Sequence, residues 1–138
     1  MRKSIYIFLV TLTLVGCDKD ENGPASLIST WTRTEMYSID GSGNKSHNLH
    51  DYSAECEKDN LYQFNENNDF FLKEGNKTCN PSSEKTDKYE LIENGSKIKF
   101  YKGGIWEITS LTESSLKITQ PLPSGTVFRE MVTTYSRK

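Results

Sequence analysis

The chain has 138 residues and a formal net charge of −2, with 17 basic and 19 acidic side chains mixed along its length. This balance excludes the broad basic surface that nucleic-acid-binding proteins use to neutralise phosphates, so we expect no nucleic-acid partner. Only 34% of the residues are hydrophobic, which is low for a globular protein, but 11% are aromatic and can build a compact core from few positions.

The first 17 residues have the organisation of a lipoprotein signal peptide. A positively charged start, Met1–Lys3, is followed by an apolar run over Ile5–Val15, and Gly16 precedes Cys17. The apolar run is too short to cross a bilayer. We therefore expect cleavage after Gly16 and a thioether-linked diacylglycerol on Cys17. With palmitate among its acyl chains, this lipid would hold the protein in a membrane without a transmembrane helix.

Removal of residues 1–16 leaves 122 residues, which suits a single domain, and lowers the formal net charge to −4. Residues 17–26 are polar and rich in turn-forming side chains. They predict a flexible tether between the lipid and one domain over residues 27–138.

The tether also carries a charge pattern that bears on location. Lys19 is followed by Asp20 and Glu21, an order that resembles the surface-export signal of some Gram-negative lipoproteins. The resemblance implies an outer-membrane lipoprotein exposed at the cell surface, and a solvated spacer with no addressing role is the alternative. Either way we expect a protein of the cell envelope whose membrane contact is its N-terminal lipid.

The three cysteines separate by role. With Cys17 lipidated, Cys56 and Cys79 form an even pair in a chain exported to an oxidising compartment. A zinc or redox site is disfavoured because no Cys-x-x-Cys spacing occurs. We predict a Cys56–Cys79 disulfide that closes a loop of about 24 residues and stabilises the fold by about 3 kcal/mol.

The clearest hairpin centres on Asn94–Gly95, because both residues tolerate the positive φ angles of a type I′ turn. A two-residue loop there places apolar side chains opposite each other on one face and opposite charges on the other. The predicted pairs are Tyr89 with Phe100, Leu91 with Ile98, and Glu90 with Lys99.

The next connection, Lys102–Gly104, predicts a three-residue loop with a glycine in the left-handed conformation. Three consecutive strands would then share one buried face and one charged face. The predicted pairs are Phe100 with Trp106, Ile98 with Ile108, and Lys99 with Glu107.

An earlier hairpin is predicted around Glu66–Asn68, with Asn68 in the left-handed conformation. This register places Phe64 opposite Phe70 and Tyr62 opposite Leu72. It also brings Cys56 beside Cys79, so the disulfide would clasp the open end of the hairpin.

Further strands are predicted over residues 31–39, 115–119 and 127–135, with Leu116 and Ile118 directed inward. Residues 40–55 form a long polar loop that includes at most a short strand, and no segment has a sustained helical period. We therefore expect an all-β fold: a small antiparallel up-and-down barrel of about eight strands, because closure removes exposed sheet edges.

These segments resemble the lipocalin-like domain of small bacterial lipoproteins, over about residues 27–137. The resemblance depends on residues 27–31 (LISTW), 56–60 (CEKDN), 62–67 (YQFNEN), Cys79 and 108–116 (ITSLTESSL). It implies that Trp31 plugs the closed end of the barrel beneath Arg137, although Trp31 could instead line a ligand cavity.

Six side chains are candidates for the barrel interior, where they either line a ligand pocket or pack as ordinary core. They are Trp31, Tyr62, Phe64, Tyr89, Phe100 and Trp106.

The sequence shows no candidate catalytic residues, cofactor site or metal site. His47 and His50, near Asp51 and Glu55, carry side chains that bind metals, but in a polar loop we interpret them as surface residues. No base, nucleophile and oxyanion donor are arranged together, so we expect no enzyme.

The sequence thus predicts a lipid-anchored protein that binds a small apolar or amphipathic molecule, or a partner protein, through the barrel mouth and residues 40–55. The alternative is an accessory lipoprotein with a filled barrel that contacts another envelope protein.

Overall fold

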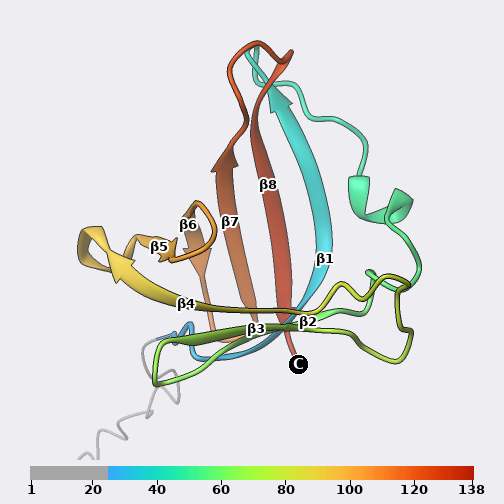
Figure 1. Cartoon of the computed structure of the whole chain (residues 1–138). Helices are drawn as coiled ribbons and strands as arrows, with labels where there is room; N and C mark the ends of the chain where they lie inside the picture. Colours follow the sequence, from blue (N-terminus) through green and yellow to red (C-terminus); the bar gives the residue numbers. More distant parts are fainter. Residues whose placement is uncertain (1–24) are drawn as a thin grey trace, which may run out of the picture.

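The structure is a computed structural model, and it describes residues 25–138. Eight antiparallel strands close into a barrel in sequence order, with β8 paired to β1 (Figure 1). The strands are β1 (Ser29–Asp40), β2 (Leu61–Phe64), β3 (Asp69–Lys73), β4 (Lys85–Ile92), β5 (Lys97–Phe100), β6 (Ile105–Leu111), β7 (Ser115–Pro121) and β8 (Phe128–Arg137). The predicted all-β, eight-stranded up-and-down barrel is confirmed. The predicted signal peptide, Cys17 and most of the tether lie outside the described residues.

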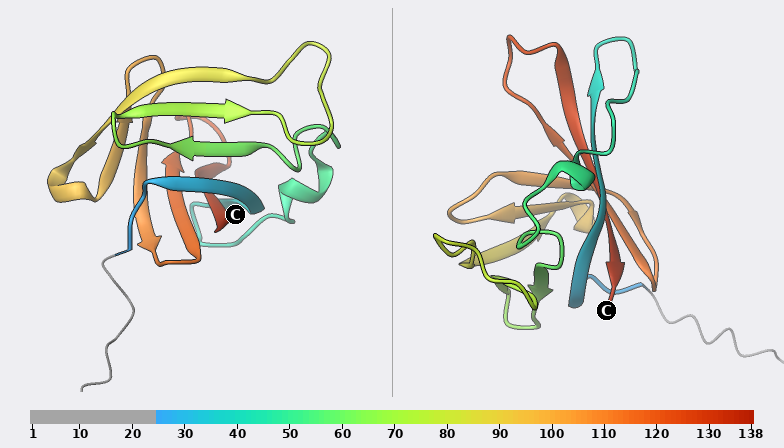
Figure 2. Two further views of the ribbon diagram at one scale, coloured as in Figure 1. Left: turned by 90° about the horizontal axis from the view of Figure 1, so that it is seen from below. Right: turned by 90° about the vertical axis from the view of Figure 1, so that its right-hand side faces the viewer.

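The strands differ in length, and this difference shapes the barrel. β1 and β8 have 12 and 10 residues, whereas β2 and β5 have four each. β1 and β8, together with β7, form a long curved wall that projects beyond the short strands (Figure 1). Two further views show the same arrangement from below and from the side (Figure 2). One end of the barrel is therefore tightly wrapped and the other is partly open.

The hairpin of β2 and β3 has the predicted register. Phe64 pairs with Phe70 and Tyr62 with Leu72. Asn68 adopts φ 63°, the left-handed conformation expected of it. The Asn65 N–H donates to the Asp69 carbonyl oxygen at 3.0 Å and closes the three-residue loop.

The hairpin of β4 and β5 also has the predicted register, with Tyr89 opposite Phe100 and Leu91 opposite Ile98. The turn is the short segment η2 (Glu93–Gly95), in which the Ser96 N–H donates to the Glu93 carbonyl oxygen at 3.2 Å. The shared apolar face is only partly buried. Ile98 is fully buried, but Leu91 is 49% exposed and lies outside the core cluster.

The register of β5 and β6 differs from the prediction by two residues. Ile98 pairs with Trp106, and Lys97 with Glu107. The predicted pairs that are wrong are Phe100 with Trp106, Ile98 with Ile108, and Lys99 with Glu107. The loop has four residues, 101–104, and neither Gly103 nor Gly104 is left-handed.

A contact from another strand explains this difference. Both carboxylate oxygens of Asp87 on β4 accept the backbone N–H of Lys102, at 3.2 and 3.1 Å. The Tyr101 N–H donates to the Lys88 carbonyl oxygen at 3.0 Å. A slip of two residues keeps every side chain on its original face, so Phe100 and Trp106 still touch, with ring centroids 4.5 Å apart.

The long loop predicted over residues 40–55 is present and extends over residues 41–60, because β1 includes Asp40 and β2 begins at Leu61. Its regular structure is a single bridge between Ile39 and Lys45 and a 3-10 turn, η1 (Leu49–Tyr52). The Asn48 side chain caps η1 by accepting the His50 N–H. The loop returns along β1, where the Ser46 N–H donates to the Ser38 carbonyl oxygen at 2.9 Å.

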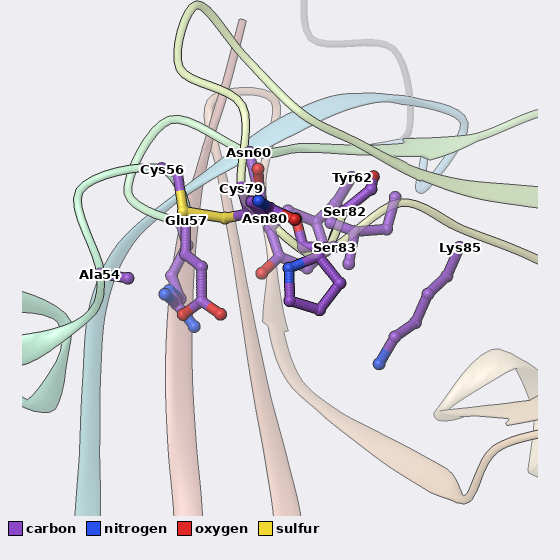
Figure 3. A pocket seen from close by; sticks show the side chains of 13 residues that line it. Ala54, Cys56, Glu57, Asn60, Tyr62, Cys79, Asn80, Ser82, Ser83 and Lys85 are labelled. Atoms are coloured by element: carbon purple, nitrogen blue, oxygen red, sulfur yellow. Dashed lines mark hydrogen bonds between the residues drawn. A yellow bond between two sulfur atoms is a disulfide. The ribbon is translucent and has the colours of Figure 1, made fainter.

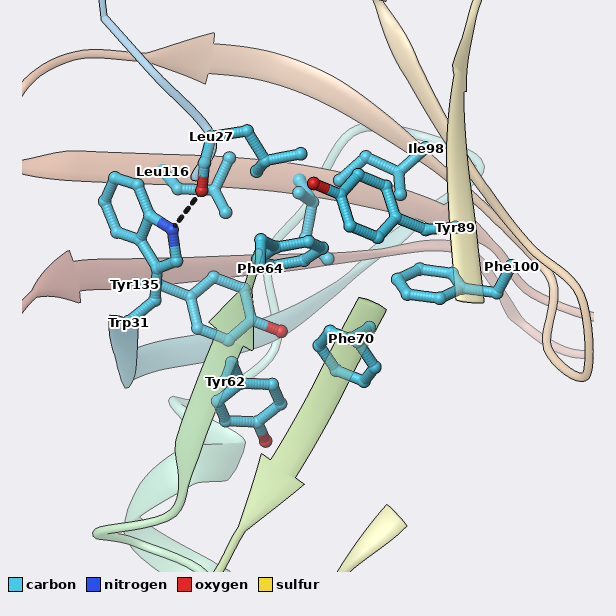
Figure 4. Close-up of a cluster of buried hydrophobic side chains, with 11 residues drawn as sticks. Leu27, Trp31, Tyr62, Phe64, Phe70, Tyr89, Ile98, Phe100, Leu116 and Tyr135 are labelled. Atoms are coloured by element: carbon cyan, nitrogen blue, oxygen red, sulfur yellow. Dashed lines mark hydrogen bonds between the residues drawn. The ribbon is translucent and has the colours of Figure 1, made fainter. Parts of the chain in front are cut away.

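Aromatic and branched apolar side chains fill the tightly wrapped half of the barrel (Figure 4). Phe64 lies at the centre of this cluster, with its ring centroid 5.0 Å from that of Phe70 and 5.1 Å from that of Tyr89. Leu116 and Ile118 of β7 point inward as predicted and are buried. Burial of each such side chain stabilises the fold by about 1.5–3 kcal/mol, so few apolar positions suffice.

Candidate functional site

The two ends of the barrel differ in what covers them. At the closed end the strands are joined by short turns, and residues 25–28 enter there. The opposite end, which we call the mouth, carries the four loops 41–60, 74–84, 101–104 and 122–127.

Trp31 plugs the closed end. Its side chain is fully buried, and its indole N–H donates to the Leu27 carbonyl oxygen at 2.9 Å (Figure 4). The Arg137 guanidinium lies 5.0 Å from the ring centroid and donates to the Ser26 carbonyl oxygen at 2.8 Å. Of the two alternatives for Trp31, the structure shows the plug, because the pockets of the mouth are lined by other residues.

The mouth loops are tied together by the Cys56–Cys79 disulfide, which confirms the predicted bridge; the two Cα atoms lie 5.3 Å apart. Glu74 organises the second loop, because its Oε1 accepts the backbone N–H groups of Cys79 at 3.1 Å and Ser83 at 2.7 Å. The Asn60 side chain, which is 3% exposed, donates to Ser83 Oγ at 3.1 Å. These contacts hold loops 41–60 and 74–84 as one rim.

The first pocket opens beneath this rim and has a volume of about 520 Å³. Its wall combines the rim with inward-facing strand residues. The side chains that matter for its chemistry are Arg33, Glu57, Asn60, Tyr62, Leu72 and Lys85. In the view of Figure 3, Glu57 and Lys85 lie on opposite sides of the pocket, with Ser82 and Ser83 between them.

The second pocket has a volume of about 390 Å³ and shares Lys85 with the first. Its base is an aromatic floor that we define as Phe70, Phe100 and Trp106. The ring centroids of Phe70 and Phe100 lie 5.0 Å apart, in an edge-to-face arrangement. Pockets of several hundred Å³ with a largely apolar wall and few polar groups are typical of small-molecule sites.

The six interior candidates divide between the two halves of the barrel. Tyr62 lines the first pocket, and Phe100 and Trp106 belong to the floor of the second. The other three lie in the closed half: Trp31 is the plug, and Phe64 and Tyr89 pack in the filled core. The packed core therefore occupies the closed half, and both mouth pockets lie on the other side of it. A further hollow of about 460 Å³ lies at the closed end, where residues 25–28 meet Leu91, Ile108 and Leu111.

Sequence reasoning missed the three charged members of the first pocket, Arg33, Glu57 and Lys85. Arg33 follows Trp31 by two residues on β1, so the period of a strand could have placed it on the inward face. Lys85 begins β4, after a loop whose path depends on the disulfide and on Glu74. No local pattern marks it.

The Arg33 guanidinium is held by neutral partners. Its Nε donates to His50 Nδ1 at 3.2 Å, and its Nη2 donates to Ser53 Oγ at 2.9 Å. Burial raises the pKa of the Tyr62 hydroxyl and that of the fully buried Tyr135. Both phenols therefore stay protonated, and Tyr62 presents a neutral side chain to the first pocket.

Of the two histidines in the long loop, His50 belongs to the Arg33 network. Burial lowers the pKa of His50, and the nearby Arg33 charge lowers it further. Over residues 25–138, no three His, Cys, Asp or Glu side chains are grouped to hold a metal ion. No helix in the same part of the chain is long and apolar enough to cross a membrane.

Comparison with known proteins identifies the family. A family model described as a lipocalin-like domain matches residues 27–118, which is more than half of the chain. No curated protein and no solved structure matches significantly. The match covers β1–β6 and the start of β7, and β8 completes the barrel that such a domain requires. The chain therefore belongs to the lipocalin-like domain family.

Proposed function

We propose that this protein is a non-enzymatic binding protein of the cell envelope that holds a small amphipathic or apolar molecule in the mouth of its barrel. The observation that carries the proposal is the pair of adjoining pockets, of about 520 and 390 Å³, above an aromatic floor. A lipocalin-like barrel is generally a binding fold, and the two mouth pockets have the volume of a ligand site.

Mass spectrometry under native conditions, on the protein purified from its own host, tests the ligand. We expect wild-type protein to carry a bound small molecule. Leu72→Trp would fill the first pocket and should lose the molecule. Ile105→Trp, at a position that is 46% exposed and lines neither mouth pocket, should retain it. Equal masses of retained ligand in the two variants would contradict a site in the mouth.

The second candidate is an accessory protein that docks on another envelope protein. It is favoured by the tip of the β7–β8 hairpin, where Val127 is 78% exposed and Phe128 is 37% exposed. The same mass spectra separate the two candidates. A retained protein, lost on Val127→Ser with Phe128→Ser but kept in Leu72→Trp, would favour docking.

We also propose that a lipid on Cys17 anchors the protein. The support is the signal-like sequence of residues 1–17, together with the entry of residue 25 at the closed end. An anchor eight residues before that point would join the domain to the membrane from the side of its closed end and leave the mouth free of the attachment.

Labelling of cells with radioactive palmitate tests the anchor. Wild-type protein should take up the label and sediment with membranes, and Cys17→Ser should do neither. The outer leaflet of the outer membrane, which the Lys19–Glu21 charge pattern suggests, predicts that protease added to intact cells degrades the domain. Protection of the domain in intact cells would overturn the surface assignment.

A further inference from the structure

Arg33 is a partly buried cation in the mouth that forms no ion pair with the described residues. Its hydrogen bonds go to His50 Nδ1, Ser53 Oγ and Met36 Sδ, which are all neutral. The ion pairs found over residues 25–138 are made by lysines, and no carboxylate there lies within ion-pair distance of Arg33. A desolvated charge without a partner is unfavourable, so Arg33 favours an anion beside it.

Lys85 adds a second positive charge at the junction of the two pockets. It is exposed, and it too forms no ion pair among the described residues. Glu57 is the one carboxylate in the wall of the first pocket, against the two positive charges of Arg33 and Lys85, and it lies across the pocket from Lys85 (Figure 3). The first pocket therefore has a positive excess.

The second pocket provides an apolar surface next to these charges. Its own charged side chains, beyond Lys85, are Lys102 and Asp87. Both carboxylate oxygens of Asp87 accept the Lys102 backbone N–H, so this carboxylate is held against the 101–104 loop. The aromatic floor lies below them, with Trp106 packed edge-on against Phe100.

From this arrangement we infer that the ligand is an anionic amphiphile. Its acidic head binds between Arg33 and Lys85 in the first pocket, and its apolar tail lies on the aromatic floor of the second. This inference rests on the proposed function and deepens it by naming the ligand class. It distinguishes the mouth from a purely apolar pocket, in which an uncharged chain would bind as well as an acid.

Three probes with the same twelve-carbon chain test the charge of the head: dodecanoate, dodecanol and dodecyltrimethylammonium. Titration calorimetry on the full chain carrying Cys17→Ser should show dodecanoate binding about tenfold or more tightly than dodecanol. The trimethylammonium compound should bind most weakly. The advantage of dodecanoate should shrink as sodium chloride is raised, because salt screens exposed charges.

Substitutions then locate the head. Arg33→Gln should weaken dodecanoate about tenfold and leave dodecanol unchanged, and Arg33→Lys should restore part of the loss. Lys85 is exposed, so Lys85→Gln tests the same idea without loss of folding, and it should weaken dodecanoate several-fold. Arg129→Gln removes an exposed charge on β8 outside both pockets and should change neither affinity.

Tryptophan fluorescence locates the tail. The chain has two tryptophans, Trp31 in the closed end and Trp106 in the floor. Dodecanoate should change the emission of wild-type protein but not that of Trp106→Phe.

The outcomes separate the inference from the function on which it rests. Binding of dodecanol as tight as that of dodecanoate, or equal effects of Arg33→Gln on both, would overturn the anionic head and leave the proposed function standing. Failure of all three probes to bind would overturn both. Selective binding of dodecanoate that depends on Arg33 and Lys85 would establish the inference.

Discussion

Arg33 and Trp31 lie on the same strand two residues apart, yet they serve opposite ends of the barrel interior. Trp31 is fully buried and closes one end, whereas Arg33 reaches the mouth. A strand directs alternate side chains to one face, so the sequence could place both inside but could not tell filled space from hollow space. That distinction depends on which loops cover each end.

Gly75 shows how closely the two rim loops approach. A β-carbon at this position would overlap the backbone carbonyl oxygen of Asp59, which belongs to the loop before β2. We expect Gly75→Ala to lower the free energy of unfolding by about 1–3 kcal/mol, because backbone cannot move aside as a flexible side chain can. Urea denaturation measures the change. Gly104→Ala, where a β-carbon meets nothing within 4 Å, is the control and should be neutral.

His50 makes the mouth sensitive to mild acid. Its Nδ1 accepts the Arg33 Nε–H, so this nitrogen must be unprotonated. Burial lowers the pKa of His50 below the ordinary 6.5, and the Arg33 charge lowers it further. Lys58 adds a smaller lowering effect, and the Asp51 charge opposes the shift. Because the unfolded chain takes up the proton first, this stabilisation is complete above pH 6.5 and is lost as pH falls through the lowered pKa.

Chemical denaturation between pH 7.5 and 5.5 should therefore show a loss of stability in wild-type protein that is smaller in His50→Gln. The loss stays below about 1 kcal/mol, since His50 is partly exposed and screened. His47→Gln, which removes no contact with Arg33, should behave as wild type. An identical pH profile for all three proteins would contradict the role of His50.

At the scale of elements, turns determined by their own residues were predictable and turns determined from elsewhere were not. Asn68 and Asn94–Gly95 specify the β2–β3 and β4–β5 registers through backbone angles that few residues adopt. The 101–104 loop instead takes its conformation from Asp87 on β4. A shift of two residues keeps the same side chains on the apolar face, so the hydrophobic period cannot distinguish the observed register of β5 and β6 from the predicted one.

Asp87→Ala tests this dependence. Loss of its bonds to the Lys102 N–H should cost about 1 kcal/mol and speed hydrogen exchange at Lys102 and Tyr101. Exchange measured by NMR gives both values. Glu90→Ala removes a carboxylate of the same strand that forms only a surface ion pair with Lys99, and it should leave the loop unchanged.

At the scale of the whole molecule, the disulfide supports a barrel whose mouth half contains little packed core. Replacement of both Cys56 and Cys79 by serine should lower the free energy of unfolding by about 3 kcal/mol, while far-ultraviolet circular dichroism still reports β-structure at low temperature. Ligand affinity should fall with it, because the rim loops lose their link. Cys17→Ser alone should leave the unfolding energy unchanged. A double-serine protein as stable as wild type would contradict this role.

The sequence predicted the barrel, the disulfide and the plug, because turn residues, cysteine number and family resemblance each report on them. The pockets were not predictable. The wall of the first pocket comes from loops 54–60 and 79–84, which the disulfide, Glu74 and Asn60 hold together across long sequence separations. Lys85 reaches the first pocket because the loop before it is held in place by these contacts. The second pocket takes part of its wall from the 101–104 loop, whose conformation depends on Asp87.

The pairing of Arg137 with Trp31, and the bond from the Lys138 N–H to the Thr30 carbonyl oxygen at 3.0 Å, bring the start and finish of the domain together. A short peptide could join them, and the exposed residues 123–126 offer a place to cut the chain anew. The new termini of such a circular permutant would lie at the mouth. A support attached to them would hold the domain by its mouth and leave the closed end free, with all eight strands unchanged.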